Sequence, residues 1–514
     1  MKFMVLIPKE VKEVAEKLEE SGFKAYLVGG CVRDLLLGFE PKDWDVATNA
    51  KPEQIQKIFS DSVYENNFGT VGVKIPTLKG VGTPTSAERS VGADFEKKKI
   101  DIVEVTTFRI EGKYTDKRHP DEVKFARNIE EDLARRDFTI NAFAMDLGGR
   151  ITDPFNGRKD LKDKLIRTVG DPKERFNEDA LRLVRAIRFA VELNFSAKGG
   201  PASGWKIESK TAKAIEVDAG LFEMIAKERV RDEFVKIIMT SRAAEGIRML
   251  ENYGLLKFIM PELREGIGCG QNKHHIYEVF EHNVRALDYA ASKYYSFVIR
   301  LASLLHDVGK PRTKRGEGPD STFYNHEVVG AKMTLKILDR MRFGKEIVEG
   351  VGHLVRSHLF YYNVGEVTES GVRRFLARVG PENIPDLIKV READRIGSGV
   401  PKAVPYKIRH LLFMIDKVKH DPIHPKMLVV KGDDVMRFLK IEPGPRVGQI
   451  LSILLEEVLD DPSKNTRENL EYRIQDLGKL DAKELEKLSM KAHEKKEEFE
   501  LGVEDEMKRK HAVS

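Results

Sequence analysis

Residues 26–48, YLVGGCVRDLLLGFEPKDWDVAT, contain the pattern from which the organisation of the N-terminal part of the chain follows. An apolar run at 26–28 leads into Gly29 and Gly30, and a segment with Arg33 that favours a helix comes next. Two glycines at a strand-to-helix turn let backbone N–H groups face an anion, and the helix N-terminus adds positive potential. The pattern predicts a phosphate-binding turn between a strand and a helix.

Two aspartates follow this turn, where a second strand is expected to open. Asp43 and Asp45 stand at i and i+2, a spacing that points both side chains to one face of a strand. Paired carboxylates beside a phosphate-binding turn are what a two-metal phosphoryl-transfer site requires. We predict that they bind Mg²⁺, with one ion activating an attacking hydroxyl and the other holding a triphosphate. A later strand supplies a third acid, Glu104 in preference to Asp101; the alternative for Glu104 is an edge-strand charge.

The length and composition limit the number of domains, the partners and the location of the protein. The 514 residues are enough for roughly three domains. The net charge is only +5, because 83 acids offset 88 bases, so a nucleic-acid partner is permitted but not required. The two cysteines, Cys31 and Cys269, exclude a disulfide framework and fit a cytoplasmic protein. The sequence has no signal peptide and no apolar stretch of about 18 residues, so we expect no membrane partner.

The chain changes character near residue 150. The first part reads as mixed α/β, with strands near 69–75 and 99–107 paired across a long hairpin loop at 78–99, and the remainder reads as helical. We therefore expect an α+β fold, a mixed sheet followed by all-α domains. The expected domains are 1–150, a head; 151–268, a helical neck and body; 269–420, a histidine-rich domain; and 421–514, a helical tail. The insertions at 78–99 and 196–206 have no functional interpretation.

Five further motifs follow GGCVRD…DWD in order. They are EVTTFR (104–109), EEDLARRDFTINAFAMD (130–146), DPFNG (153–157), EDALRLVRAIRFA (178–190) and KERVRDE (227–233). Over about residues 20–270 the chain resembles the class II tRNA nucleotidyltransferase and poly(A) polymerase family. The resemblance implies a polymerase-β-like palm in the head. It also implies addition of C and A to the 3′ acceptor end of tRNA from CTP and ATP, with Mg²⁺.

The same resemblance implies a set of nucleotide-binding residues. They are Gly29, Gly30, Arg33, Arg109, Arg136, Asp137, Asp179, Arg182, Arg185 and Arg188. Arg136 would contact the nucleotide and Asp137 its ribose; the alternative for Asp137 is a salt-bridge cluster at a helix N-terminus. Residues 109–123 resemble the family's flexible loop, which argues against an enzyme limited to CC addition. The loop does not separate CCA addition from A-only addition.

The segment from Glu178 onward carries the specificity prediction. Asp179 and Arg182 stand at i and i+3, so we expect them to be neighbours on one helix face. A carboxylate beside a guanidinium can match the donors and acceptors of a base edge, and the resemblance implies that this pair selects C and A. Arg185 and, less directly, Arg188 would then face the triphosphate. The alternative for these arginines is a solvated surface, which the apolar residues between them disfavour.

A second constellation lies at 270–400, where imidazoles and carboxylates alternate along predicted helices. The order H…HD…H…D suits a mono- or dinuclear phosphohydrolase metal site and resembles the HD-domain metal phosphohydrolases. The resemblance implies four primary ligands for a divalent transition metal of unknown identity: His282, His306, Asp307 and Asp394. Candidates for a second metal are His326, His353 and His358, and Lys310 could contact a phosphate. The domain would hydrolyse damaged tRNA 3′ ends; the alternative is a structural domain that supports tRNA.

The sequence thus predicts a cytoplasmic tRNA nucleotidyltransferase that carries an HD domain. One alternative is an A-adding enzyme or a poly(A) polymerase, since the same motifs serve. A second is an HD-type nucleotide phosphohydrolase whose N-terminal domain only senses nucleotide, and a third is a non-catalytic RNA-binding protein. The intact aspartate pair and arginine motifs argue against the last two. The oligomeric state and the role of the C-terminal helices stay open.

Overall fold

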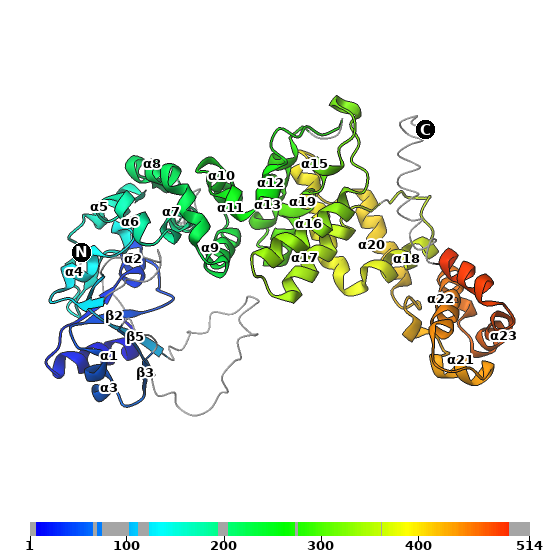
Figure 1. Ribbon diagram of the computed structural model, residues 1–514, viewed down its shortest axis with the longest axis horizontal. Coiled ribbons are helices and arrows are strands. Elements are labelled where there is room, and N and C mark those ends of the chain that lie inside the picture. The colour runs from blue at the N-terminus through cyan, green and yellow to red at the C-terminus, as the bar shows by residue number, and fades with distance from the viewer. Residues whose placement is uncertain are drawn as a thin grey trace. The chain divides into compact units, whose positions relative to one another are not determined.

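The computed structural model describes residues 7–64, 69–74, 102–111, 123–193, 204–272, 276–360 and 362–492. The chain divides into two compact units, one formed by Met1–Arg264 with Arg340–Arg342, the other by Glu265–Asp339 with Phe343–Ser514. The expected α+β class is confirmed: the first unit contains a mixed sheet followed by helices, and the second is helical (Figure 1). Among the described residues, no helix is long and apolar enough to cross a membrane.

Seven strands form one mixed sheet in the first unit, in the order β3-β4-β5-β2-β1-β8-β9. Their bounds are Ala25–Val28 (β1), Asp45–Thr48 (β2), Ser62–Tyr64 (β3), Thr70–Lys74 (β4), Ile102–Thr107 (β5), Ala144–Met145 (β8) and Ile151–Thr152 (β9). Strands β2 and β5 run parallel, and the other neighbours are antiparallel. The predicted strand pair is confirmed, since β4 pairs with β5. The predicted loop at 78–99 lies outside the described residues.

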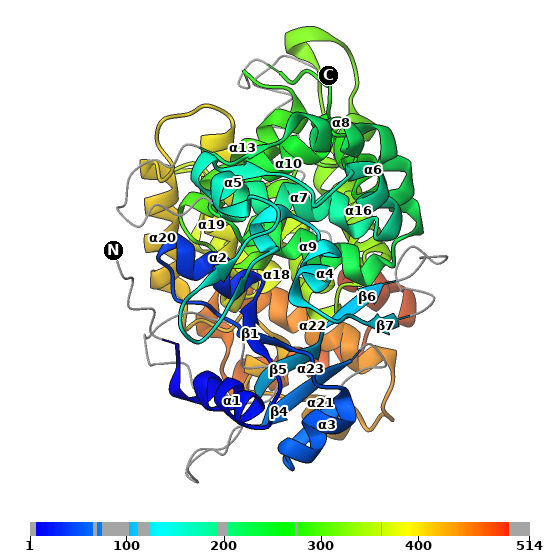
Figure 2. The same ribbon diagram turned by 90° about the vertical axis from the view of Figure 1, so that its left-hand side faces the viewer.

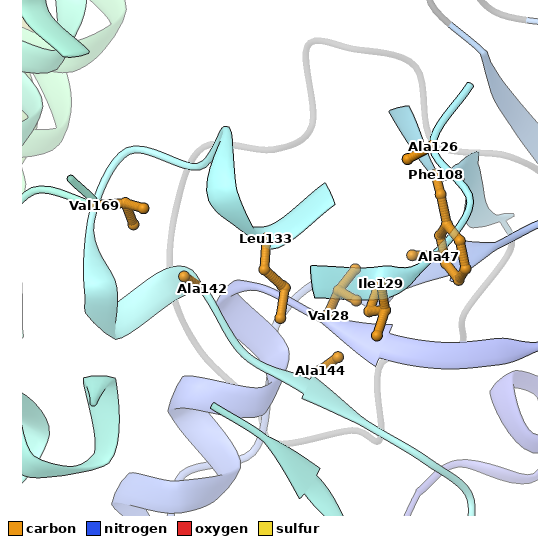
Figure 3. Packing of buried hydrophobic residues seen from close by; sticks show 9 residues of the cluster. All are labelled: Val28, Ala47, Phe108, Ala126, Ile129, Leu133, Ala142, Ala144 and Val169. Carbon is orange, nitrogen blue, oxygen red and sulfur yellow. The ribbon is translucent and has the colours of Figure 1, made fainter. Parts of the chain in front are cut away.

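The sheet buries apolar side chains on both faces. Helices α1 (Lys9–Glu20) and α3 (Pro52–Ile58) lie side by side against strands β1, β3 and β4 (Figure 2). A second cluster joins β1 and β2 to α4 (Ile129–Ala134), where Val28, Ala47, Phe108, Ile129 and Leu133 meet (Figure 3). Burial of such side chains contributes roughly 1.5–3 kcal/mol each and holds these strands in place.

Helices complete the first unit. They are α2 (Gly30–Leu37), α5 (Gly157–Asp163), α6 (Pro172–Glu178), α7 (Leu181–Glu192), α8 (Ser209–Asp218), α9 (Lys227–Met239), α10 (Ala243–Asn252), α11 (Leu256–Ile259) and α12 (Pro261–Arg264). Two short ladders accompany them, β6 (Arg109–Glu111) with β7 (Val123–Phe125) and β10 (Leu165–Ile166) with β11 (Lys206–Ile207). Helix α7 packs against α9 and α10 and is almost wholly buried, as its apolar residues predict.

The second unit is a succession of helices. They are α13 (Val279–Ser292), α14 (Phe297–Leu305), α15 (Lys310–Thr313), α16 (His326–Arg340), α17 (Lys345–Ser357), α18 (Glu369–Val379), α19 (Ile384–Gly397), α20 (Tyr406–Val418), α21 (Gly432–Leu439), α22 (Pro445–Asp460) and α23 (Arg467–Gly478). Helix α14 is apolar on nearly every side because α13, α17 and α19 all pack against it. This packing brings the histidine-rich segments together. The residues of the tail beyond 492 lie outside the described chain.

Candidate active site

Two of the predicted metal-binding carboxylates lie on neighbouring strands. Asp45 is the first residue of β2 and pairs in register with Glu104 of β5. Residues paired across a ladder project to the same face, so the two carboxylates stand side by side. Glu104 is exposed while its neighbours Val103 and Val105 are buried, so its side chain points away from the α1 and α3 side of the sheet.

Asp43 lies in an exposed bend just before β2, so its predicted place on the strand is wrong. The reason is the partner strand: the β1–β2 register ends at Leu27 and Val46, and the chain of β1 turns away at Gly29. Burial raises the pKa of the Asp45 carboxyl, the charge of Arg136 opposes this rise, and the Asp43 carboxylate adds to it. Crowded carboxylates are stabilised by a cation, so these residues fit a divalent metal with oxygen ligands.

Gly29 is required at the turn for two reasons. Its φ of +78° is rare for residues with a side chain, and a Cβ placed there would stand 2.4 Å from Nη1 of Arg136. The glycine therefore lets a guanidinium lie directly over the turn, close to Asp45. The N–H of Gly29 donates to the carbonyl of Phe143, so this one of the backbone N–H groups expected to face an anion does not. The positive character of this turn comes instead from Arg136 and from the start of α2 at Gly30.

A chain of hydrogen bonds connects the turn to the neck helix α7. Arg33 donates to Asn141 over 2.7 Å, and Asn141 donates to Oδ1 of Asp137 over 3.0 Å. Arg185 donates to Oδ2 of Asp137 from both Nε and Nη2, over 2.9 and 2.6 Å. Burial opposes ionisation of Asp137, but Arg185 and Asn141 hold the pKa of that carboxyl well below its usual range. Its predicted contact with the ribose stays a prediction.

Asp132 is a residue of this site that the sequence reasoning missed. It is 1% exposed and accepts hydrogen bonds from the backbone N–H of Arg109 and from the side chain of Arg135. Its second oxygen lies 3.6 Å from Nη2 of Arg136. The signal in the sequence was an aspartate three and four residues before two arginines, a spacing that α4 and the turn after it bring together. Asp132 thereby joins Arg136 to the first residue of β6; residues 112–122 of the predicted flexible loop lie outside the described chain.

The expected Asp179–Arg182 pair on one helix face is wrong in this structure. Helix α7 begins at Leu181, so Asp179 lies in an extended link after α6, where its carboxylate caps the N–H of Leu181 and binds Arg229. The side chain of Arg182 is not paired with Asp179 and donates instead to Glu178 and to the carbonyls of Arg175 and Arg135.

The two remaining arginines of α7 are also paired with acids. Arg188 lies 3.0 Å from a carboxylate oxygen of Glu233 and stacks on Phe189, with 4.1 Å between the guanidinium carbon and the ring centroid. Burial and the neighbouring charge of Arg185 lower the pKa of Arg188. The KERVRDE motif thus supplies Arg229 to Asp179 and Glu233 to Arg188, contacts that no local spacing reveals. The predicted triphosphate contacts of Arg185 and Arg188 stay predictions.

The histidine-rich residues converge in the second unit on two groups of metal-ligand type. His282, His306 and Asp394 form one group, and Asp307, His326 and His358 form the other; within each group the candidate ligand atoms lie within 4.8 Å of one another. Nε2 of His282 is 2.9 Å from Nε2 of His306. Two imidazole nitrogens at this distance need a proton or a cation between them, because their lone pairs face each other.

Asp307 belongs to the second group but also faces the first. Its Oδ2 is 3.1 Å from Nε2 of His282, and its Oδ1 is 3.3 Å from Nε2 of His326 and 3.6 Å from Nε2 of His358. Lys310 lies 2.6 Å from Oδ2 of Asp307 and also donates to Gln271, so its contact with a phosphate stays a prediction.

The outward nitrogens of three histidines in this cluster are held by the backbone. Nδ1 of His306, His326 and His358 lies 2.7–2.8 Å from the carbonyl three residues earlier, which leaves each Nε2 directed at the cluster. His353 is different: its Nε2 donates to the carbonyl of Val379, so its candidacy as a ligand is wrong.

The charges of this cluster bear on its protonation. Burial opposes protonation of His306, but the carboxylates of Asp307 and Asp394 raise its pKa to about 10. Burial lowers the pKa of His358 to about 4. The carboxylates thus favour a positive charge among the imidazoles of the cluster, and its donor set fits borderline divalent metals.

Four family models match successive parts of the chain. Residues 25–167 match the Poly A polymerase head domain family, 204–267 a family described as the probable RNA and SrmB-binding site of polymerase A, 279–398 the HD domain family, and 410–473 a tRNA nucleotidyltransferase domain 2 family. The CCA-adding enzyme of Lactococcus lactis subsp. lactis is 32% identical over 465 residues, which cover 89% of this chain and 94% of that enzyme. The A-adding tRNA nucleotidyltransferase of Deinococcus radiodurans is 36% identical over 446 residues, 84% of this chain and 91% of that enzyme.

Among solved structures, the Bacillus stearothermophilus CCA-adding enzyme in complex with CTP matches with a TM-score of 0.62 and 26% identity, over 91% of this chain and 96% of that one. The fold and the site define a nucleotidyltransferase with an HD domain. The chain belongs to the family of tRNA nucleotidyltransferases that includes the CCA-adding enzymes. The resemblance seen in the sequence is confirmed.

Proposed function

We propose that this protein adds C and A to the 3′ end of tRNA from CTP and ATP, without a nucleic-acid template. The in-register pair of Asp45 and Glu104, beside the Gly29 turn and Arg136, carries this proposal. The 3′-hydroxyl oxygen attacks the α-phosphorus, and pyrophosphate leaves. Asp43, Asp45 and Glu104 would hold Mg²⁺, which lowers the pKa of the attacking hydroxyl and neutralises the leaving group.

The arginines of the site would supply the remaining charge and the choice of base. Arg136 lies over the turn where a triphosphate would bind, so its charge would stabilise the leaving pyrophosphate. For Asp179 and Arg182 to read a base together, they must exchange Arg229 and Glu178 for the nucleotide. We propose that nucleotide binding drives this exchange. Arg185 and Arg188 would reach a triphosphate only by a similar exchange with Asp137 and Glu233.

Addition of C and A is preferred to addition of A alone, but two relatives of comparable similarity carry the two different names. The test supplies tRNA that lacks CCA, or ends in C or CC, with one nucleotide at a time. We expect C on the first two substrates and A on the third. Incorporation of A on the CC-ended tRNA alone would replace the proposal with the A-adding enzyme, and untemplated A runs would indicate a poly(A) polymerase.

We also propose that the HD domain is a metal-dependent phosphohydrolase that acts on phosphate groups at tRNA 3′ ends. The two ligand groups, both of which the Asp307 carboxylate faces, support this second activity. The test incubates the protein with tRNA ending in a 3′-phosphate or a 2′,3′-cyclic phosphate and follows phosphate release. We expect activity that His306→Ala abolishes and that His353→Ala, outside the cluster, retains. A wild-type protein without any release would favour the structural alternative.

The division into a head at 1–150, a neck and body at 151–268, an HD domain at 269–420 and a tail at 421–514 is also a proposal. The boundaries of the matched families, 25–167, 204–267, 279–398 and 410–473, support it. A cytoplasmic location is proposed on the same basis, because tRNA is the substrate.

A further inference from the structure

Helix α20 carries a row of aromatic rings that neither active site uses. Tyr406, His410 and Phe413 stand at i, i+4 and i+7, so they share one helix face. Tyr406 is 60% exposed and Phe413 is 61% exposed, and contiguous exposed rings indicate an interaction site more than single ones do. The ring centroids of Tyr406 and His410 are 5.9 Å apart, and so are those of His410 and Phe413. The three rings therefore form a continuous ladder on the surface of the second unit.

His410, the middle ring of the ladder, is held in place by a hydrogen bond from a buried tyrosine. Tyr362 is 8% exposed, and its hydroxyl lies 2.5 Å from Nδ1 of His410. With the phenol as donor, Nδ1 accepts and Nε2 carries the proton on the side away from Tyr362. The guanidinium carbon of Arg409 lies 6.0 Å from the ring centroid of Tyr406. The ladder thus combines flat apolar faces, one imidazole donor and one adjacent cation.

The charge around the ladder identifies its partner. Exposed cations on α20 and beside it outnumber the acids near them, which are Asp416, Glu369 and Glu366; the cations are Lys402, Lys407, Arg409, Lys417 and Lys419. Lys417 pairs with Glu369 and Lys419 with Asp416, whereas Lys407 contacts the amide of Asn363, which itself donates to Glu366. The net charge of this group is positive, and Arg409 brings one of its cations beside the ring of Tyr406. Rings next to cations bind single-stranded nucleic acid, because bases stack on the rings while phosphates contact the cations.

We propose that Tyr406, His410 and Phe413, none of which belongs to either active site, form a stacking surface for unpaired bases of an RNA. This proposal depends on the proposed function in one respect: it takes the RNA to be the tRNA substrate. Each ring offers a face to one base regardless of its identity, and Arg409, beside Tyr406, would contact an adjoining phosphate. The surface would raise affinity for the RNA without contributing to nucleotide selection.

The test measures binding of full-length protein to tRNA lacking CCA by fluorescence anisotropy. The double variant Tyr406→Ala/Phe413→Ala should weaken binding about tenfold or more, whereas Tyr406→Phe/Phe413→Tyr, which keeps both rings, should bind like wild type. Tyr472→Ala is the matched control, since Tyr472 is 68% exposed on α23. The KM for tRNA should rise, with the KM for CTP and ATP unchanged. Because no phosphate contact is removed, the dependence of log Kd on log salt should keep its slope.

An unchanged Kd for the double alanine variant would overturn the proposal, and so would an equal loss in Tyr472→Ala. Sedimentation equilibrium tests whether a second copy of the chain, instead of RNA, binds the ladder. A wild-type dimer that the double variant abolishes, with tRNA affinity unchanged, would assign the ladder to a second copy of the chain and overturn the RNA surface. A wild-type protein that binds tRNA through the ladder but incorporates no nucleotide would overturn the proposed function and leave this surface standing.

Discussion

Asp45 and Glu104 stand opposite each other in register across the parallel strands β2 and β5. Segments far apart in the chain thus place two carboxylates on one face of the sheet. Asp43 lies outside the ladder, in the bend before β2, and adds its charge from there. The acidic centre is therefore built from one strand pair and one adjacent bend.

Removal of either aspartate should abolish nucleotide incorporation while binding of tRNA largely survives. Asp43→Ala and Asp45→Ala each remove a proposed metal ligand, and we expect a fall of about a thousandfold or more in kcat, measured with radiolabelled ATP on CC-ended tRNA. Asp61→Asn serves as the control, because Asp61 is an exposed residue paired with Lys74. Full activity in either alanine variant would contradict the two-metal proposal.

Gly29→Ala should inactivate the enzyme through Arg136. A methyl group at Gly29 meets the guanidinium, so the arginine must leave the turn. Gly22→Ala is a matched control: Gly22 has a similar φ of +85° but nothing within 4 Å of the added Cβ. Both substitutions should cost about 1 kcal/mol of folding free energy from backbone strain, but only Gly29→Ala should lose nucleotide incorporation. Equal activities of the two variants would argue against a role for the Gly29–Arg136 contact.

Arg182→Ala should relax the choice between CTP and ATP. The measurement is the ratio of kcat/KM for the two nucleotides on a tRNA that ends in C, and we expect the ratio to change about tenfold or more. Arg229→Ala, which releases Asp179 from its partner, should change the same ratio by a different route. An unaltered ratio in Arg182→Ala would count against base reading at the start of α7.

The HD cluster should bind two metal ions per chain. Elemental analysis of the wild type should find about two, and His282→Ala or His326→Ala should each leave about one, because each belongs to a different group. Asp307→Ala should lose both ions, since its two oxygens face both groups. His353→Ala is the control and should keep both ions. A single ion in the wild type that His326→Ala does not displace would limit the site to the His282 group.

Asp137 should make the first unit more stable at neutral pH than in acid. Its folded pKa lies below the unfolded value, so its contribution is present above about pH 4 and is lost as pH falls toward the folded pKa. Asp137→Asn should cost about 3 kcal/mol at pH 7, because it removes the closer of the two carboxylates that pair with Arg185 and leaves Glu233 at 3.7 Å, and the gap from wild type should narrow below pH 4. Both tryptophans, Trp44 and Trp205, lie in the first unit, so their fluorescence during urea unfolding reports on it. A gap independent of pH would contradict this account.

Much of the fold and of the site could be predicted from local pattern. The strand–Gly-Gly–helix turn, the aspartate pair, the buried helix α7 and the H…HD…H…D order follow from the spacing of residues that are near each other in the chain. The chemical class follows from the same spacing, since carboxylates, glycines and imidazoles have few uses in such arrangements. The error at Asp43 arose because strand length depends on the partner strand, which turns away at Gly29.

The sequence by itself determined the kinds of residue at both sites, because short motifs select a chemistry through residue type and spacing. Only the tertiary structure decided which of them share contacts. It separated Asp179 from Arg182 by giving each a partner from elsewhere, Arg229 and Glu178. It let Asp307 face both ligand groups and left His353 outside them. Such pairings depend on helix packing and strand register, which arise from the burial of the whole chain and not from neighbours along it.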